Sequence, residues 1–373
     1  MSVVVPPIPV GPVGQPDIQY LPDATKYAAR TRRRQEGEEL SKSLPDGFPR
    51  ELSSDLAWDG KELAKVYDWN YHLTEDDLKE VERALEHFKA LGVPLGQVSQ
   101  ETFPLPRLHE TLRSISKEVH QGRGFKVIRG VPVDQHTREE NIIIYAGITS
   151  HIAPVRGRQD NIHQGQSSDV VLAHITDLSR QVDTQTIKAP AYTTEKQVFH
   201  TDADDIITLF ALEKAAEGGQ SYLSSSWHVY NELARTRPDL IRTLAEPWRL
   251  IIQYARRNFT GYWGKPRSAT LPPITEAQAE ALDALHYLAE RSSVSLDFHK
   301  GDIQVVNNLS IFHTRAKFTD SGEKRRHLVR LWLQDPELAL GTPDGLKSRW
   351  EFVYGGVTAE KSVFPLDPFV RSQ

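Results

Sequence analysis

The feature that most constrains the fold is a set of short β-type segments that carry histidine, carboxylate and arginine side chains. The segment His200-Thr201-Asp202 lies just before the β-rich run 206–212, and His313 follows much later in a second such region. Residues two apart in an extended chain point to the same face. His200 and Asp202 can therefore bind one metal ion together, with Thr201 turned away, if His313 reaches the same place from another strand.

Two histidines and one carboxylate form the facial triad of non-haem iron(II) oxygenases. Three ligands on one face of an octahedron leave three positions open, two for a 2-oxo acid and one for O2. A His-x-Asp pair alone is a weak signal, because about one such pair is expected by chance in a chain with 14 histidines. Packing in the core is the more common explanation for any single histidine. The metal interpretation therefore depends on the surrounding strands.

A downstream segment, 325–333, alternates polar and apolar side chains as a strand does. The alternation places Arg326, Leu328 and Arg330 on one face and His327 on the other. An arginine side chain suits the binding of an anion, because its planar fork pairs with a carboxylate through two hydrogen bonds. The segment thus predicts two cations near the histidines, although a surface position on an edge strand is the alternative for Arg326.

Together these stretches resemble the taurine dioxygenase and clavaminate synthase superfamily of iron(II)/2-oxoglutarate-dependent oxygenases, in particular its fungal members in secondary metabolism. The resemblance covers about residues 105–335, and His200, Asp202 and His313 match the iron ligands. It is carried by the stretches 124–132, 171–175, 200–221, 301–304 and 313–333. It implies an α+β fold whose mainly β core is a distorted double-stranded β-helix, or jelly roll, with flanking helices and a helical insertion.

The resemblance also implies how the cosubstrate and substrate bind. Arg326, 13 positions after His313, matches the arginine that binds the distal carboxylate of 2-oxoglutarate. Ser221 stands where many relatives have a threonine that helps to hold this carboxylate, although ordinary turn chemistry also explains a serine there. Arg330 matches a position that binds an acidic group of the substrate in some relatives, whereas in others the neighbouring arginine takes part in holding the cosubstrate.

The reaction implied by the resemblance uses iron(II), 2-oxoglutarate and O2. It oxidises an unactivated C–H bond of a small molecule and releases succinate and CO2. We expect a carboxylate-bearing substrate, with an amino acid as the working hypothesis and hydroxylation, desaturation or oxidative cyclisation such as aziridine formation as outcomes. Two alternatives stay open: a catabolic sulfonate or aryloxyacetate dioxygenase with the same chemistry, and a non-catalytic β-barrel binding protein.

Composition excludes several other kinds of site and partner. The chain of 373 residues has no cysteine and a net charge of −5. Disulfides and thiolate metal sites are therefore excluded, and secretion gains no support. The negative net charge does not indicate a nucleic-acid-binding surface. No apolar run is long enough to predict a membrane helix. We expect a cytoplasmic enzyme with a small-molecule substrate and with no nucleic-acid or membrane partner, while homo-oligomerisation stays open.

The remaining patterns predict how the chain is organised. Residues 1–50, rich in proline and charge, are expected to be irregular, with the arginines of the mixed-charge run 30–39 exposed. Residues 51–373 are expected to form a single oxygenase domain. Its β core is predicted at about 170–335, interrupted by the helical insertion at about 226–292.

Individual elements are predicted from periodicity and caps. A capping box at Thr275 opens a helix, to about residue 292, whose apolar stripe is expected to pack on the sheet. The polar stretch 153–170 predicts a loop or lid over the site, and Asp204 and Asp205 are expected to be structural. Amphipathic patterns predict further helices over 74–91, 108–119 and 137–150, and a strand over 125–129.

Overall fold

The centre of the molecule is one large β-sheet. The computed structural model describes residues 12–245, 254–262, 267–339, 341–342 and 344–371. The strand order is β1-β2-β11-β7-β14-β3, and β6 also pairs with β14. These strands are β1 (Asn70–His72), β2 (Phe125–Arg129), β3 (Val155–Arg156), β6 (Leu172–Thr176), β7 (Ile206–Glu213), β11 (Ile303–Asn307) and β14 (His327–Gln334). β1 and β2 are parallel, and the other neighbours are antiparallel.

A smaller antiparallel sheet faces the large one. It consists of β10 (Val294–Leu296), β9 (Ser221–Ser225) and β12 (Ile311–Arg315). Phe125 and Ile207 of the large sheet share a buried apolar cluster with Leu223 and Ile311 of the small one. The two sheets are therefore held face to face by their inward-pointing side chains, as in other packed sheets. Short pairings are made by β8 (Glu217–Gly218) with β13 (Phe318–Thr319), and by β4 (Asp160–His163), β5 (Gln166–Val170) and β15 (Ser362–Val363).

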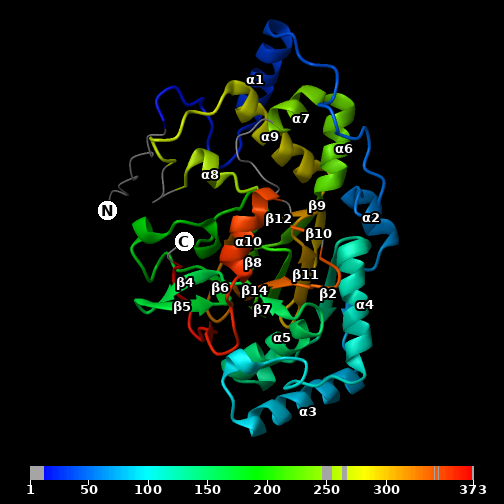
Figure 1. Ribbon diagram of the computed structural model, residues 1–373. Helices are drawn as coiled ribbons and strands as arrows, with labels where there is room; N and C mark the ends of the chain where they lie inside the picture. Colours follow the sequence, from blue (N-terminus) through cyan, green and yellow to red (C-terminus); the bar gives the residue numbers. More distant parts are fainter. Residues whose placement is uncertain (1–11, 246–253, 263–266, 340, 343, 372–373) are drawn as a thin grey trace.

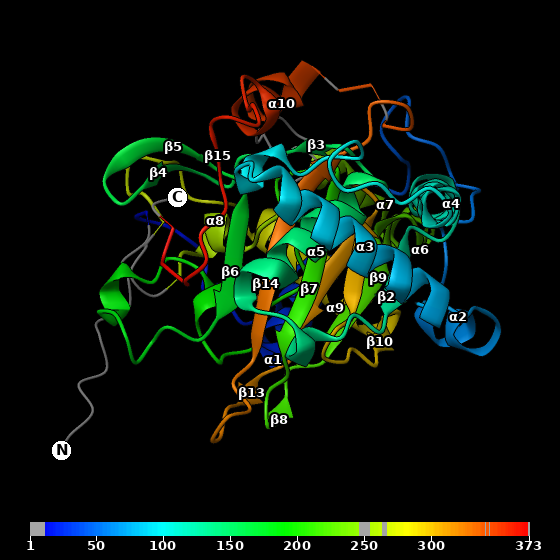
Figure 2. The same ribbon diagram turned by 90° about the horizontal axis from the view of Figure 1, so that it is seen from below.

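Helices cover the other face of the large sheet. They are α3 (Glu75–Leu91), α4 (Leu108–Gln121) and α5 (Arg138–Ser150), and Figure 2 shows α3 and α5 lying across the strands. Ile206 and Phe210 of β7 belong to the apolar cluster under these helices, whereas Ile207 faces the small sheet. This alternation follows from the period of two along a strand. The large sheet is thus buried on both faces.

A second group of helices lies at the opposite end of the molecule, at the top of Figure 1. It consists of α1 (Ala24–Gly37), α6 (Ser226–Thr236), α7 (Pro238–Ala245) and α9 (Glu276–Arg291). The expected packing of α9 on the sheet is confirmed for the small sheet, because Ala279 and Leu282 lie in one cluster with Phe312 of β12. The same cluster contains Leu233 of α6 and Leu240 of α7. Parts of the insertion, 246–253 and 263–266, lie outside the described residues. The other helices are α2 (Gly60–Val66), α8 (Arg257–Thr260) and α10 (Lys347–Tyr354), with 3-10 turns at Leu95–Gln97, Val133–Gln135, Thr184–Thr186, Pro190–Tyr192 and Asp344–Leu346.

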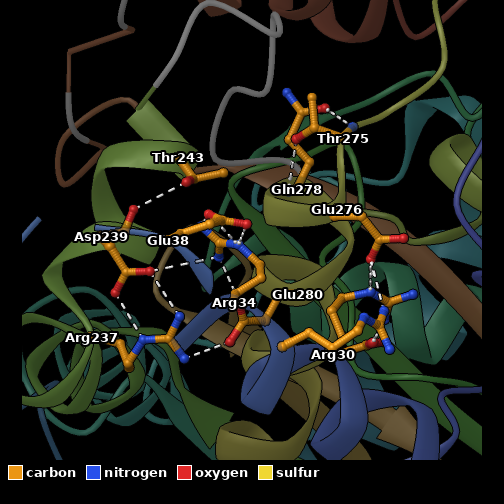
Figure 3. A network of polar contacts seen from close by, with 12 residues as sticks. Arg30, Arg34, Glu38, Arg237, Asp239, Thr243, Thr275, Glu276, Gln278 and Glu280 are labelled. Carbon is orange, nitrogen blue, oxygen red and sulfur yellow. Dashed lines mark hydrogen bonds and ion pairs between the residues drawn. The ribbon is translucent and has the colours of Figure 1, made fainter. Parts of the chain in front are cut away.

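The N-terminal region is more ordered than its sequence predicts, although residues 1–11 lie outside the described residues. The segment expected to be irregular contains α1, which Asp23 caps by accepting hydrogen bonds from two backbone amides. Two arginines expected to be exposed are buried instead. Arg30 pairs with Asp283 at 2.7 Å. Arg34 pairs with Glu280 at 2.5 Å, as Figure 3 shows, and both carboxylates belong to α9. The carboxylates that pair with these two arginines lie far along the chain. No sequence pattern near Arg30 or Arg34 could therefore predict that they are buried.

Most of the other predicted elements are confirmed. Thr74 and Asp77 form a capping box that starts α3, and Gly92 ends it with a left-handed φ of 63°. The strand over 125–129 and the capping box at Thr275 are also present. The stretch 153–170 differs, because it forms β3, β4 and β5 instead of a loop. Among the helices that the structure describes, none has the length and apolarity to cross a bilayer.

Candidate active site

His200, Asp202 and His313 meet at one point between the two sheets. One ligand atom from each lies within 4.8 Å of the others. His313 belongs to β12, and the backbones of His200 and His313 exchange two N–H···O bonds of 3.0 Å. The expectation that His200 and Asp202 share a regular strand is wrong, because His200 forms only an isolated bridge and Asp202 lies in the loop that follows. The spacing nevertheless brings all three side chains together.

The two imidazoles are neutral and oriented for a metal ion. His200 Nδ1 donates a hydrogen bond to the Val198 carbonyl at 2.8 Å, which leaves the lone pair of Nε2 free. Burial lowers the pKa of both histidines, and burial with the nearby His200 ring brings that of His313 to about 3. Neutral imidazole is the form that binds metals.

A loop clamped by one asparagine holds Asp202. Asn308 accepts a hydrogen bond from the Asp202 amide at 2.7 Å and donates to the Asp204 carbonyl at 2.8 Å. Arg330 Nη1 lies 2.5 Å from Asp202 Oδ2. Burial acts to raise the pKa of Asp202, but Arg330 and the two imidazoles outweigh it and lower that pKa below its usual value. Asp202 is therefore an anion beside two neutral imidazoles.

A cavity of about 600 Å³ opens beside these residues, and Arg326 and Ser221 line it. Arg326 is 5% exposed, its Nη1 has no hydrogen-bond partner among the described residues, and burial lowers its pKa. Ser221 Oγ donates to Gln304 Oε1 at 3.0 Å. Gly219, with a φ of +74°, lies against Arg326, where an added Cβ would come within 3.2 Å of the arginine Cδ. Glycine thus gives the guanidinium room in the cavity wall.

Two further cavity residues were missed by the sequence reasoning. Arg315 follows His313 by two residues and lies on the same face of β12. Its guanidinium is 4.6 Å from the centre of the Phe318 ring. The period of two along the strand could have revealed it. Tyr20 enters the cavity from the N-terminal segment, and its hydroxyl accepts a hydrogen bond from the Val198 amide at 3.3 Å. No sequence pattern pointed to Tyr20.

The remaining candidates behave as follows. Arg330 lines the cavity, but its guanidinium is already engaged by Asp202 and by Gln159, whose Oε1 accepts from Nε at 2.8 Å. His327 points away from the cavity and bonds His174 at 2.7 Å, as the alternation predicts. Asp205 accepts hydrogen bonds from Gln334 and Trp350, and burial raises its pKa to about 6, which fits a structural role.

Comparisons with known proteins agree with this geometry. The profile of the "Taurine catabolism dioxygenase TauD, TfdA family" matches residues 87–257 and 247–332. Taurine hydroxylase-like protein SAT17 of Stachybotrys chartarum is 36% identical over 347 residues, which is 85% of this chain and 89% of that protein. FR-33289 synthase of Streptomyces rubellomurinus is 25% identical over 309 residues, or 74% and 88% of the two chains.

Among solved structures, the non-heme iron oxygenase OrfP in complex with Fe, succinate and (3R,4R)-dihydroxy-L-Arg has a similar fold. Its TM-score is 0.50 at 16% identity, covering 71% of this chain and 94% of that one. The fold is therefore the mixed α/β architecture of that structure. The chain belongs to the TauD/TfdA family. It is an iron(II)/2-oxoglutarate-dependent dioxygenase with a small-molecule substrate.

Proposed function

We propose that His200, Asp202 and His313 bind the iron(II) ion of this dioxygenase. The observation that carries the proposal is the meeting of two neutral imidazoles and one carboxylate within 4.8 Å. This donor set suits a divalent iron ion and leaves coordination positions free. Asn308 and the Val198 carbonyl fix the carboxylate loop and the His200 ring, so the ligands are oriented before the metal arrives.

The same proposal assigns 2-oxoglutarate to the neighbouring wall of the cavity. Arg326 binds its distal carboxylate through the two-pronged pairing that a guanidinium makes with a carboxylate. Arg315 adds a second positive charge, and the Ser221 hydroxyl adds a hydrogen-bonding group on the same wall. When bound, iron and 2-oxoglutarate together activate O2 to oxidise the substrate, with release of succinate and CO2. The protein's own part is to hold both beside the cavity.

The substrate, in this proposal, is a small anionic molecule with an unactivated C–H bond near the metal. A carboxylate-bearing molecule, and an amino acid in particular, remains our working hypothesis, with hydroxylation, desaturation or ring closure as outcomes. Arg330 stays a predicted substrate contact, although its pairing with Asp202 at 2.5 Å also supports a role in holding that carboxylate. The similarity to taurine hydroxylase-like protein SAT17 favours a sulfonate as the second candidate substrate. Membership of the family argues against a non-catalytic protein.

Three broader expectations belong to the same proposal. The two facing sheets would form the distorted double-stranded β-helix, within one domain over residues 51–373. The enzyme would act in the cytoplasm, since a chain without cysteine gives no sign of an oxidising compartment.

Iron binding and succinate formation test the proposed ligands directly. We expect the native enzyme to retain equimolar iron(II) after dialysis and to form succinate from 2-oxoglutarate, and His200→Ala and Asp202→Ala to lose both. His87→Ala, which changes an exposed histidine of α3, is the matched control and should lose neither. Full iron binding by folded His200→Ala would overturn the assignment.

A further inference from the structure

Four more arginines line the cavity, and none of them contributes to the proposed iron or 2-oxoglutarate sites. Arg256 pairs with Asp283 at 2.6 Å, whereas the other three form no ion pair with a described residue. These three are Arg257 at the start of α8, Arg349 on α10 and Arg371 near the C-terminus. They come from separate parts of the chain, since α8, α10 and the C-terminal end are far apart in the sequence (Figure 1). Three segments that are distant in the sequence thus each contribute one guanidinium to the same cavity.

The hydrogen bonds of these arginines involve neutral groups. Arg257 donates to the Lys188 carbonyl at 2.9 Å. Arg371 donates to the Tyr192 hydroxyl and to the Gln159 carbonyl, both at 3.0 Å. The Arg349 guanidinium lies 5.2 Å from the centre of the Phe352 ring.

Within the described part of the chain, no carboxylate lies within 4.0 Å of Arg257, Arg349 or Arg371. Two other buried arginines do have a carboxylate partner. Asp283 lies 2.7 Å from Arg30 and 2.6 Å from Arg256, and both arginines are buried. Arg371 is buried, and Arg257 and Arg349 are half-buried. A cation largely removed from water is costly without a counter-charge, so three such cations around one cavity indicate that a ligand supplies the charge.

The charge of the cavity indicates what that ligand must carry. Asp202 is the one carboxylate among its described lining residues, and it already pairs with Arg330. In the proposed function, the carboxylates of 2-oxoglutarate balance the positive charges of Arg315 and Arg326. After burial, Arg371 is the main influence that lowers the pKa of Arg257, and Arg371 and Arg257 both lower that of Arg349, so the three repel one another. A single negative charge would leave most of this repulsion in place.

We infer that Arg257, Arg349 and Arg371 form a substrate subsite for a group with two negative charges, namely a phosphate monoester or a phosphonate. Such a group offers three acceptor oxygens to guanidiniums that arrive from three directions. The inference rests on the proposed function, because it places the reacting C–H bond between this subsite and the metal. Within the proposed function, it favours a carboxylate-bearing substrate that also carries a phosphate or phosphonate group over one that does not.

Binding of matched probes to the anaerobic enzyme, loaded with iron(II) and 2-oxoglutarate, tests the inference by calorimetry. The probes are propyl phosphate, propylphosphonate, propanesulfonate and butyrate at pH 8. There propyl phosphate is largely a dianion, propylphosphonate is a mixture of mono- and dianion, and the other two are monoanions. We expect at least one dianion to bind about tenfold or more tightly than propanesulfonate, which is tetrahedral but singly charged. The two dianion arms show whether the group is an ester or a phosphonate. Equal affinities across the series would overturn the inference.

Substitutions then locate the subsite. Arg349→Gln is the first choice, because Arg349 is partly exposed and has no ion pair in the described structure. We expect it and Arg257→Gln to weaken dianion binding about tenfold or more, while the exposed α3 control Arg83→Gln does not. The visible absorption of the iron–2-oxoglutarate complex is recorded in each sample. Normal absorption without preferential dianion binding refutes the subsite alone, whereas loss of the absorption in native enzyme refutes the proposed function.

Discussion

Arg326 is a buried cation whose counter-ion is absent from the described chain. Its Nη1 lacks a partner, and Arg315 adds to the positive charge beside it. We predict that Arg326→Gln raises the KM for 2-oxoglutarate by about a hundredfold, because a charge-assisted pair contributes roughly 3 kcal/mol in a buried site. Steady-state succinate release measures this effect. Arg325→Gln removes the exposed neighbour and should leave the KM unchanged; similar values for the two variants would remove Arg326 from the cosubstrate site.

Asn308 acts on the metal through Asp202, so it is a positioning residue. Its side chain binds the Asp202 amide and the Asp204 carbonyl. We predict that Asn308→Ala weakens iron(II) affinity by about 10- to 100-fold, the usual effect of losing a residue that orients a ligand. At saturating iron, the KM for 2-oxoglutarate should stay near its native value. Unchanged iron affinity in a competition assay with a chelator would show that the loop needs no clamp.

The sequence predicted which residues meet at the candidate metal site better than it predicted their environment. The His-x-Asp spacing and a distant histidine pointed to His200, Asp202 and His313, whose ligand atoms the structure brings within 4.8 Å of one another. The ion pair of Arg330 with Asp202 could not be predicted, since it depends on how β14 and the Asp202 loop are placed. Tyr20 was missed because it belongs to no motif.

At the scale of elements, the sequence predicted best what is local. The capping box at Thr275 marked the start of α9, and the amphipathic pattern over 74–91 marked α3, because both signals lie within or beside the helix in the chain. The helix α1 was missed because its stabilising partners are on α9. Arg34 of α1 and Arg237 share Glu280, each at 2.5 Å, which Figure 3 shows.

This ion network predicts a large effect of one substitution. Arg34→Ala leaves the fully buried Glu280 with one cation fewer, and we expect a loss of about 3 kcal/mol in the free energy of unfolding. Urea denaturation measures it. Arg33→Ala changes the exposed neighbour, whose side chain is 64% accessible, and should alter stability by less than about 0.5 kcal/mol. If both variants are equally stable, the network does not hold α1 on α9.

At the scale of the whole molecule, buried neutral histidines make stability depend on pH. Burial lowers the pKa of His174 to about 4 and that of His327 to about 3, whereas both are near 6.5 in an unfolded chain. Below pH 6.5 the unfolded chain therefore binds protons that the folded chain does not. Stability should fall as the pH drops from 6.5 towards 4, by up to about 1.4 kcal/mol per pH unit for each such imidazole.

A non-titrating substitution isolates this contribution. His327→Gln keeps a hydrogen-bond donor towards His174 and should reduce the slope of unfolding free energy against pH by up to about 1.4 kcal/mol per unit. Denaturant unfolding at several pH values between 7 and 5 measures the slope. His87→Gln, at an exposed position, should leave it as in the native protein. An unaltered slope in His327→Gln would mean that His327 is already protonated in the folded state.

The central claim is that His200, Asp202 and His313 hold iron beside a 2-oxoglutarate anchored on Arg326. Anaerobic titration of the metal-free protein with iron(II) and then 2-oxoglutarate tests it most directly, through the weak visible absorption band of the chelate. The account predicts that the band saturates at one equivalent of each, disappears in His313→Ala and needs far more 2-oxoglutarate in Arg326→Gln. A folded native protein that shows no band, or a band that persists in His313→Ala, would contradict it.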